Sequence, residues 1–564
     1  MRDGVNLIGD LYLPTGAGPF PVLLQRTPYG RQASTGFALM AAARGYAVVM
    51  QDTRGRWDSE GEFRPFVHEA DDGYDTCAWI CAQSWANGRI GMFGGSYVGL
   101  TQWQAALAQA PGLQAISPAI TAADYHAGWT YQGGAYQLGF NLCWATGLMQ
   151  DTAARLDKQA GGAHWLNAAM DRNDTLPIAF DRLPLMGDEL MATIAPYYDQ
   201  DWLAHPDDDL FWQSIRVEGR NHELDLACFH SGGWHDIFLG GTLRSYIGMR
   251  NHAKTATARE NQWLFINPRD HYTFSSHLPM GNYDPGTRSQ HGTIDFDGLQ
   301  LRFFNRILRD SDDALSRVKI FIMGEDAWRD ETEWPLARAI PTDLFLQSRG
   351  NANTRNGDGR LTWDAPAGDE PPDVFTYDPH NPVQTFGGPL CGHPFALNWG
   401  RRDQRELELR PDILCYSSTP LAAPLEITGP ISIHLFATSS ATDTDFTAKL
   451  VDVAPDGTAN NVIDGIIRAR YRTGPQQQVL ITPGEVNEYT IDLTATSFVF
   501  ATGHQIRLEI SSSNFPRFDR NPNHGGVIAT ATERDFMPAD QTILHDAAHP
   551  SRLSVCIVPA AGTG

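Results

Sequence analysis

Apolar runs and amphipathic stretches alternate along the first 120 residues. Short runs such as Tyr46–Gln51 (YAVVMQ) are followed by stretches such as Ala70–Gln83, in which apolar residues recur every three or four positions. Strands that are apolar on both faces and joined by single helices are typical of a parallel sheet covered on both sides. The pattern predicts strands at Pro21–Gln25, Tyr46–Gln51, Arg89–Phe93 and Leu113–Ile120, and helices at Phe37–Arg44, Ala70–Gln83 and Tyr97–Gln109.

This alternation is interrupted once and then resumes. Between residues 124 and 216 the strand signals vanish, aromatic residues become frequent, and helical periods punctuated by glycine predict a helical insertion. An insertion that leaves a sheet domain and returns to it commonly forms a lid over the active site. After the insertion we expect strands at Leu224–Phe229, Trp263–Ile266 and Val318–Met323, the last of the sheet, with helices near Leu243–Met249 and Leu299–Arg309.

The last 230 residues show a different pattern of apolar and polar positions. Short alternating strands such as Ile431–Ala437 (ISIHLFA) are separated by Gly, Pro, Asn and Asp, and no long helical period remains. This pattern is typical of a β-sandwich or jelly roll. The sequence therefore predicts an α/β protein in four segments: residues 1–123 and 217–334 form the sheet domain, 124–216 its helical insertion, and 335–564 the β domain.

The most informative chemistry lies in Met92–Gly99 (MFGGSYVG). A predicted strand ends at Phe93, a predicted helix follows Ser96, and small residues precede the serine. A tight turn from strand to helix exposes such a hydroxyl above the carboxyl edge of the sheet, beside the free N–H groups of a helix N-terminus. The match to G-x-S-x-G is imperfect, because Val98 takes the place of the second glycine and the glycine follows at 99. We expect Ser96 to be a nucleophile.

A serine nucleophile needs a base, and the base needs an orienting acid. In this fold class the acid and the histidine follow the serine in that order, each on a loop after a later strand. Asp236 and His271 stand on the loops after the strands that end at Phe229 and Ile266. We therefore predict a Ser96, Asp236 and His271 triad.

Three rivals for these roles stand close by. His235 precedes Asp236 directly, but a base beside its own acid on one loop rarely faces it. His277 lies six residues beyond His271. Asp270 could be the acid, although neighbouring side chains point apart.

The oxyanion of an acyl-transfer reaction needs two hydrogen-bond donors. The backbone N–H of Tyr97, the residue after the nucleophile, is expected to supply one. The second should come from the loop after the first predicted strand, where the hydroxyl of Tyr29 could turn over the site.

Composition narrows the function further. The formal net charge of −23 argues against nucleic acid or an anionic membrane as a partner. The 7 cysteines are scattered and odd in number, which predicts neither a disulfide framework nor a zinc site. No run of 18 apolar residues and no signal-peptide core is found. We expect a cytoplasmic protein that needs no metal or organic cofactor; its oligomeric state is left open, a homo-oligomer included.

Taken together, these motifs resemble the cocaine esterase/NonD family of α/β-hydrolases, which is related to the X-prolyl dipeptidyl peptidases and the α-amino acid ester hydrolases. The resemblance covers nearly the whole length. It implies an α/β-hydrolase domain with a helical cap and a C-terminal jelly roll, and it implies the triad and the oxyanion donors Tyr29 and Tyr97. The matching segments are RTPY (26–29), QDTRGRWDSEGEF (51–63), GGSYVGLTQWQAA (94–106), GGWHDIF (232–238), INPRDH (266–271) and SSSNFPRFDRNPN (511–523).

The resemblance also implies an acyl pocket. Trp129 and Trp144 are spaced as two pocket tryptophans of the family, and Phe238 matches its acyl-pocket phenylalanine. Ile237 and Phe238 stand where the amino acid ester hydrolases carry further carboxylates for a substrate ammonium. Because these carboxylates are absent from this loop, the sequence favours the amino-ester and dipeptidyl-peptidase interpretations less.

We therefore predict a serine hydrolase that cleaves esters with an apolar or aromatic acyl group. The main alternative is an amidase or acylase, for example one that removes glutaryl side chains from β-lactams, in which Arg269 or Arg244 could hold a distal carboxylate. A peptidase similar to the X-prolyl dipeptidyl peptidases also stays open as an alternative. A second alternative, outside enzymes, is a glycan-binding module beside an inactive hydrolase.

Overall fold

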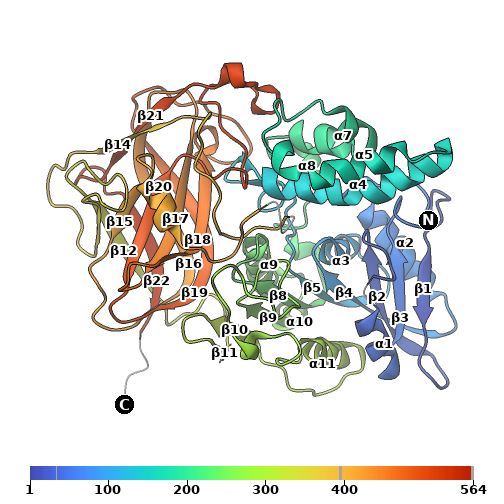
Figure 1. Ribbon diagram of the computed structural model, residues 1–564. Helices are drawn as coiled ribbons and strands as arrows, with labels where there is room; N and C mark the ends of the chain where they lie inside the picture. Colours follow the sequence, from blue (N-terminus) through green and yellow to red (C-terminus); the bar gives the residue numbers. More distant parts are fainter. Residues whose placement is uncertain (34, 393–396, 560–564) are drawn as a thin grey trace, which may run out of the picture.

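The computed structural model describes residues 1–33, 35–392 and 397–559. Its N-terminal part is a sheet with helices on both faces (Figure 1). The seven central strands are parallel, and only the edge strands β1 and β11 run antiparallel to their neighbours. Across the sheet the order is β1 (Gly9–Tyr12), β3 (Ala47–Asp52), β2 (Phe20–Thr27), β4 (Ala86–Gly95), β5 (Leu113–Ala119), β8 (Ala227–Gly233), β9 (Gln262–Asn267), β10 (Val318–Ile322) and β11 (Ala327–Glu331).

Two apolar layers hold the helices on this sheet. One layer packs α1 and α11 on one face, and the other packs α2, α3, α9 and α10 on the opposite face. The predicted elements are confirmed with ends shifted by a few residues, but Val318–Met323 is not the last strand, because β11 follows it as a polar edge hairpin. The helices are α1 (Gly36–Ala43), α2 (Glu69–Cys81), α3 (Tyr97–Leu107), α9 (Leu239–His252), α10 (Ala256–Glu260) and α11 (Phe296–Leu308).

The helical insertion between β5 and β8 forms a cap above the carboxyl end of the sheet (Figure 1). It opens with a small hairpin that the sequence did not predict. Its strands β6 (Tyr131–Gln132) and β7 (Ala135–Tyr136) have two residues each, and both turn glycines have positive φ, as in the tightest hairpin turns. The other elements are α4 (Leu138–Ala160), α5 (His164–Asp174), α6 (Leu176–Ala179), α7 (Glu189–Ile194), the π-helical turn η1 (Tyr198–Leu203), α8 (Leu210–Ile215) and the 3-10 turn η2 (Asn221–Glu223).

The C-terminal part is a β-sandwich, as the alternating pattern predicted (Figure 1). Its apolar core is continuous with residues such as Trp234 and Tyr246 of the sheet domain. Among its described residues, helical structure is limited to single short turns. The strands are β12 (Ile340–Gln347), β13 (Arg360–Thr362), β14 (Asp373–Tyr377), β15 (Leu414–Ser417), β16 (Leu425–Ser439), β17 (Asp445–Val453), β18 (Ala459–Arg468), β19 (Asn487–Phe500), β20 (Gln505–Ser511), β21 (Ala539–Leu544) and β22 (Arg552–Val558).

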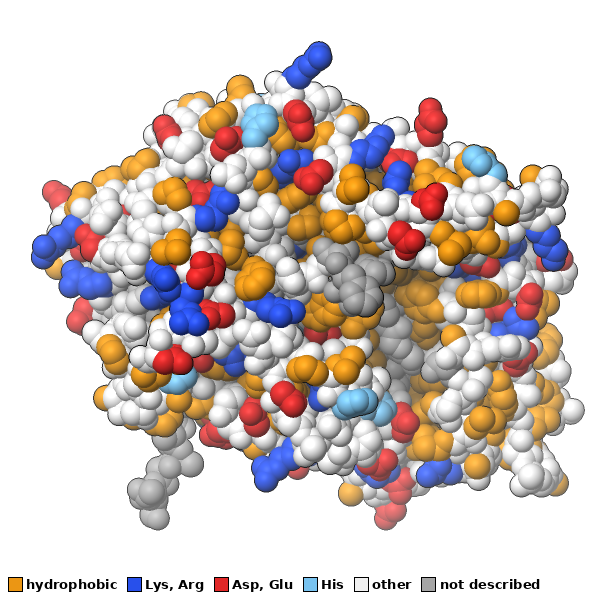
Figure 2. Space-filling model, in the orientation of Figure 1, with side chains coloured by type: hydrophobic (Ala, Val, Ile, Leu, Met, Phe, Trp, Pro, Cys, Tyr) orange, Lys and Arg blue, Asp and Glu red, His pale blue; other side chains and the backbone are white. Residues whose placement is uncertain are grey.

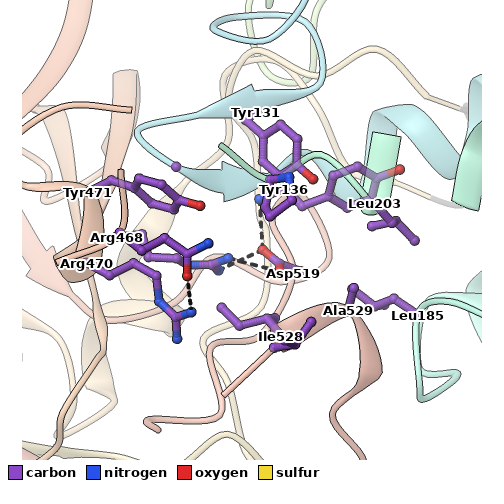
Figure 3. A pocket seen from close by; sticks show the side chains of 14 residues that line it. Tyr131, Tyr136, Leu185, Leu203, Arg468, Arg470, Tyr471, Asp519, Ile528 and Ala529 are labelled. Carbon is purple, nitrogen blue, oxygen red and sulfur yellow. Dashed lines mark hydrogen bonds and ion pairs between the residues drawn. The ribbon is translucent and has the colours of Figure 1, made fainter. Parts of the chain in front are cut away.

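Hydrogen bonds of Asp519, which is itself buried in an ion pair of the sandwich, join the sandwich to the cap. Asp519 accepts the backbone N–H of Tyr136 at 3.0 Å, donates its own N–H to the Tyr136 carbonyl at 3.0 Å, and pairs with Arg468 at 2.8 Å. These residues line a cavity of about 80 Å³ between the two parts, which Figure 3 shows from close by. The cap hairpin is therefore held by the sandwich as well as by the sheet domain.

Acidic and basic side chains are interspersed on the face of the molecule shown in Figure 2. Of the helices that the structure describes, none has the length and apolarity needed to cross a bilayer. Within the same residues, no group of three or more His, Cys, Asp or Glu side chains is placed to hold a metal ion.

Candidate active site

Ser96 stands on the turn between β4 and α3, with φ 61° and ψ −130°. This region of backbone space is sparsely populated by residues other than glycine and is tolerated where the surroundings enforce it. The Ser96 N–H donates to the Ala119 carbonyl at 2.9 Å, and the Ser96 carbonyl accepts the N–H of Leu100 at 3.1 Å. The turn thus fixes the hydroxyl above the carboxyl end of the sheet.

Two glycines make this turn sterically feasible. Gly94 has φ +124°, and a Cβ there would lie 2.3 Å from the Cγ1 of Val98. A Cβ at Gly99 would lie 2.6 Å from the Cγ2 of Thr121, where α3 crosses the loop after β5. The glycine at position 99 therefore lets the helix approach that loop, which explains the spacing that departs from G-x-S-x-G.

The structure brings the three predicted triad residues together. The Nε2 atom of His271 lies 3.0 Å from the Ser96 Oγ, and its Nδ1 atom lies 3.0 Å from the Asp236 Oδ1. The Asp236 side chain is fully buried, and that of His271 is 9% exposed. The arrangement allows the imidazole to take the serine proton while the carboxylate holds the opposite ring nitrogen.

Hydrogen bonds between two loops set this geometry. The backbone N–H of Trp234 donates to the Asn267 carbonyl at 2.9 Å, and that of His235 donates to the Arg269 carbonyl at 3.2 Å. A Cβ at Gly233 would lie 2.0 Å from the same Arg269 carbonyl. β8 runs on to Gly233, farther than the predicted end at Phe229, so the acid loop begins beside the histidine loop.

The surroundings of His271 raise its pKa. Burial disfavours the charged imidazolium and lowers the pKa, but the neighbouring Cys391 and Asp236 side chains outweigh burial and leave the pKa well above the ordinary value. The Asp236 carboxylate therefore favours the protonated histidine that forms when the serine gives up its proton.

The three rivals occupy other positions. His235 is buried, neither ring nitrogen has a hydrogen-bond partner among the described residues, and burial beside Arg401 lowers its pKa to about 3. His277 is exposed. Asp270 accepts the N–H groups of Tyr272 and Thr273 at 2.9 and 2.8 Å.

The two predicted oxyanion residues converge on Ser96 in different ways. Burial raises the pKa of the Tyr29 phenol, and the neighbouring Ser96 hydroxyl and Tyr97 backbone N–H act to lower it, which places both groups beside the phenol oxygen. The Tyr97 side chain points elsewhere: its hydroxyl donates to Glu69 Oε1 and accepts the Phe66 N–H, both at 3.0 Å. The Tyr97 side chain is thus engaged elsewhere, which leaves its backbone N–H as the group of this residue available to the site.

The predicted pocket residues form an aromatic cluster around the histidine. Phe238 is fully buried, with its ring centre 4.4 Å from that of Trp129 and 5.2 Å from that of His271. Trp144 lies on α4 and donates its indole N–H to the Tyr29 hydroxyl at 3.1 Å. All three predicted residues therefore lie near the triad, and Trp144 contacts Tyr29 directly.

Sequence reasoning missed Cys391. Its thiol, on a loop of the C-terminal sandwich, lies within hydrogen-bonding reach of the His271 imidazole and of the Tyr272 hydroxyl. No spacing signal pointed to it, because 120 residues separate Cys391 from His271 and the contact depends on how the sandwich sits against the cap.

The two arginines considered for a distal carboxylate are engaged with the protein. Arg244 pairs with Glu218 at 2.6 Å. Arg269 is fully buried and donates to the Leu278 carbonyl and the Ser289 hydroxyl, each at 2.9 Å.

Two family models match the chain. The X-Pro dipeptidyl-peptidase (S15 family) model matches residues 3–273, and the X-Pro dipeptidyl-peptidase C-terminal non-catalytic domain model matches residues 311–554. The first range ends shortly after β9, and the second includes β10 and β11 of the sheet as well as most of the sandwich.

Known proteins of similar length align over almost the whole chain. A cocaine esterase of Rhodococcus sp. (strain MB1 Bresler) is 41% identical over 575 residues, which cover 99% of this chain and 97% of that protein. The solved structure of an aminopeptidase from the marine sediment archaeon Thaumarchaeota archaeon superposes with a TM-score of 0.80 at 25% identity, covering 99% of this chain and 95% of that one. An α-amino acid ester hydrolase shares the fold, with a TM-score of 0.78 at 24% identity and the same coverage.

Proposed function

Because the chain belongs to the cocaine esterase/NonD family of serine hydrolases, we propose that it hydrolyses carboxylic esters through an acyl-enzyme on Ser96. The observation that carries this proposal is the chain of 3.0 Å contacts from Ser96 through His271 to Asp236, at the carboxyl ends of three parallel strands. A serine hydroxyl is a poor nucleophile until an adjacent base can take its proton.

In the first half of the reaction, His271 takes the Ser96 proton and the oxygen attacks the ester carbonyl. The carbonyl electrons move to the oxygen, which the Tyr29 hydroxyl and the Tyr97 N–H stabilise. When the tetrahedral intermediate collapses, the bond to the alkoxy group breaks and His271 gives its proton to the leaving alcohol. Ser96 then carries the acyl group as an ester.

In the second half, water replaces the alcohol. His271 takes a proton from water, the hydroxide attacks the acyl carbon, and the bond to Ser96 Oγ breaks as the serine recovers its proton from the imidazolium. The carboxylic acid leaves and the free enzyme is restored. Asp236 stays ionised throughout and stabilises the imidazolium.

The substrates that suit this site have an apolar acyl group, and an aromatic acyl group suits it best. Phe238 lies directly beside His271, and Trp129 stacks on Phe238; aromatic rings gain about 0.5–1.5 kcal/mol from each other beyond area burial. Among the described residues, no contact favours the acylase or dipeptidyl-peptidase alternative: Arg244 is paired with Glu218, and Ile237 stands where an ammonium would need a carboxylate.

Trapping the acyl-enzyme tests the proposed reaction. A fluorophosphonate probe is expected to label the protein once per chain, and acid-quenched turnover of a p-nitrophenyl ester should leave the acyl mass on the peptide that contains Ser96. The Ser96→Ala variant should lose both signals, because no hydroxyl remains beside His271. Labelling that persists in Ser96→Ala would reject the assignment of this serine.

Substituting Phe238 tests the acyl pocket. Wild type is expected to prefer p-nitrophenyl benzoate to the acetate in kcat/KM, and Phe238→Leu should lower the benzoate-to-acetate ratio by about tenfold, because an aromatic contact of about 1.4 kcal/mol is lost. Ile237→Val on the same loop is the matched control and should leave the ratio within twofold. A wild-type enzyme for which acetate equals or exceeds benzoate would contradict the aromatic preference.

A further inference from the structure

The hydrogen bond between Trp144 and Tyr29 has only one possible direction. An indole nitrogen donates and never accepts, whereas a phenol does both. The Tyr29 oxygen must therefore accept the Trp144 N–H at 3.1 Å. The phenol hydrogen is then directed away from Trp144, on an oxygen whose other polar neighbours include the Ser96 hydroxyl and the Tyr97 N–H.

This direction propagates through the site. When His271 is neutral with its hydrogen on Nδ1 toward Asp236, its Nε2 accepts the Ser96 hydrogen, and the Ser96 oxygen is free to accept the hydrogen of Tyr29. In this state all the donors of the series point the same way, from the cap tryptophan to the buried carboxylate. Burial raises the pKa of Tyr29, so the phenol keeps the proton that it must donate.

Trp144 is itself packed among other aromatic rings. Its ring stacks on Tyr97 with centres 5.7 Å apart at 28°, and on Trp202 of the cap at 5.6 Å and 20°. The Tyr97 ring is anchored in turn by the bond from its hydroxyl to Glu69. The indole N–H therefore has little freedom to leave the Tyr29 oxygen.

We propose that Trp144 is the positioning residue of the oxyanion tyrosine: its N–H orients the Tyr29 hydroxyl toward the oxygen that becomes negative. This rests on the proposed function, and it assigns Trp144 a role different from that of a wall of the acyl pocket. The other pocket tryptophan provides the contrast, because the buried N–H of Trp129 has no hydrogen-bond partner among the described residues.

The two roles predict different kinetics. As a positioning residue, Trp144 acts on the oxyanion and so on all esters alike, whatever their acyl group. Trp144→Phe keeps an aromatic ring and removes the donor; kcat should fall about three- to tenfold for p-nitrophenyl acetate and benzoate by the same factor, the worth of one neutral hydrogen bond, while KM stays within twofold. A pocket wall would instead change the ratio between the two esters.

A double-mutant cycle with Tyr29 is the decisive experiment. Tyr29→Phe should lower kcat by about 10²–10³, the usual loss of one oxyanion donor, and adding Trp144→Phe should then cost less than twofold. Replacing Trp144 by β-(3-benzothienyl)alanine, which has the shape of tryptophan without the N–H, should reproduce the loss of the phenylalanine variant and serves if that variant folds poorly.

Additive losses in the cycle, or a loss confined to benzoate, would overturn the proposal for Trp144. Failure of the proposed function would look different, because wild-type protein would then neither turn over esters nor be labelled at Ser96.

Discussion

Replacing His271 with glutamine is expected to lower kcat/KM for p-nitrophenyl esters by about 10⁵–10⁶. The imidazole is the base 3.0 Å from the Ser96 oxygen, and it also returns the proton to the leaving group. Glutamine has a similar reach and can hydrogen-bond to the serine, but an amide cannot take its proton at neutral pH. The measurement is the rate of p-nitrophenol release at saturating and subsaturating ester.

His277→Gln is the matched control for this variant. His277 lies six residues farther along the same segment and is exposed, so its replacement should leave kcat/KM within twofold. A His271→Gln enzyme that keeps more than a hundredth of wild-type activity would show that another group serves as the base.

Replacing Asp236 with asparagine is expected to lower kcat by about 10⁴. The carboxylate is fully buried and 3.0 Å from His271 Nδ1, where it selects the ring tautomer that leaves Nε2 free to accept the serine proton. An asparagine can turn its NH₂ group toward Nδ1 and so favour the wrong tautomer. It also removes the negative charge that stabilises the imidazolium.

The pH profile of the Asp236→Asn variant provides a second measure. kcat/KM rises with pH as His271 loses its proton in the free enzyme. The neighbouring Cys391 and Asp236 side chains raise the His271 pKa against the effect of burial, so loss of the Asp236 carboxylate should lower it. The acid limb of the residual activity should therefore move to lower pH, and a limb that stays in place or moves up would contradict the assignment.

Asp270→Asn separates the two candidate acids. Asp270 accepts backbone and side-chain donors of Tyr272 and Thr273 and has no hydrogen bond to the imidazole. Its replacement should cost far less than that of Asp236, because it disturbs the loop and leaves the contact with His271 Nδ1 in place.

Much of the sheet domain could be predicted because buried parallel strands are apolar on both faces. We could predict strands at Tyr46–Gln51 and Trp263–Ile266 without knowing which strands they pair with. The edge strands β1 and β11 were harder: one side of each strand is solvated, and their polar residues resemble loops. The prediction ended β8 at Phe229, because Gly232 and Gly233 have little intrinsic strand preference. In the structure both glycines pair with β9.

The order of the site residues was predictable, and their contacts were not. In a parallel sheet, residues after successive strands meet at one edge, so Ser96, Asp236 and His271 could be found by position alone. The hydrogen bond from Trp144 to Tyr29 and the position of the Cys391 thiol depend on how the cap and the sandwich pack against that edge of the sheet. Periodicity carries no information about such approaches between distant segments.

The placement of Cys391 has a consequence for the evolution of this architecture. Leu390, Cys391 and Phe515 belong to the C-terminal sandwich, yet they share one apolar cluster with Trp129 and Phe238 next to the histidine. Asp519 binds the cap hairpin from the same side. The sandwich thus contributes residues that pack beside the candidate site. Recombination that exchanged the sandwich for an unrelated domain would remove three features together: the apolar residues Leu390 and Phe515, the thiol of Cys391, and the contact of Asp519 with the cap hairpin.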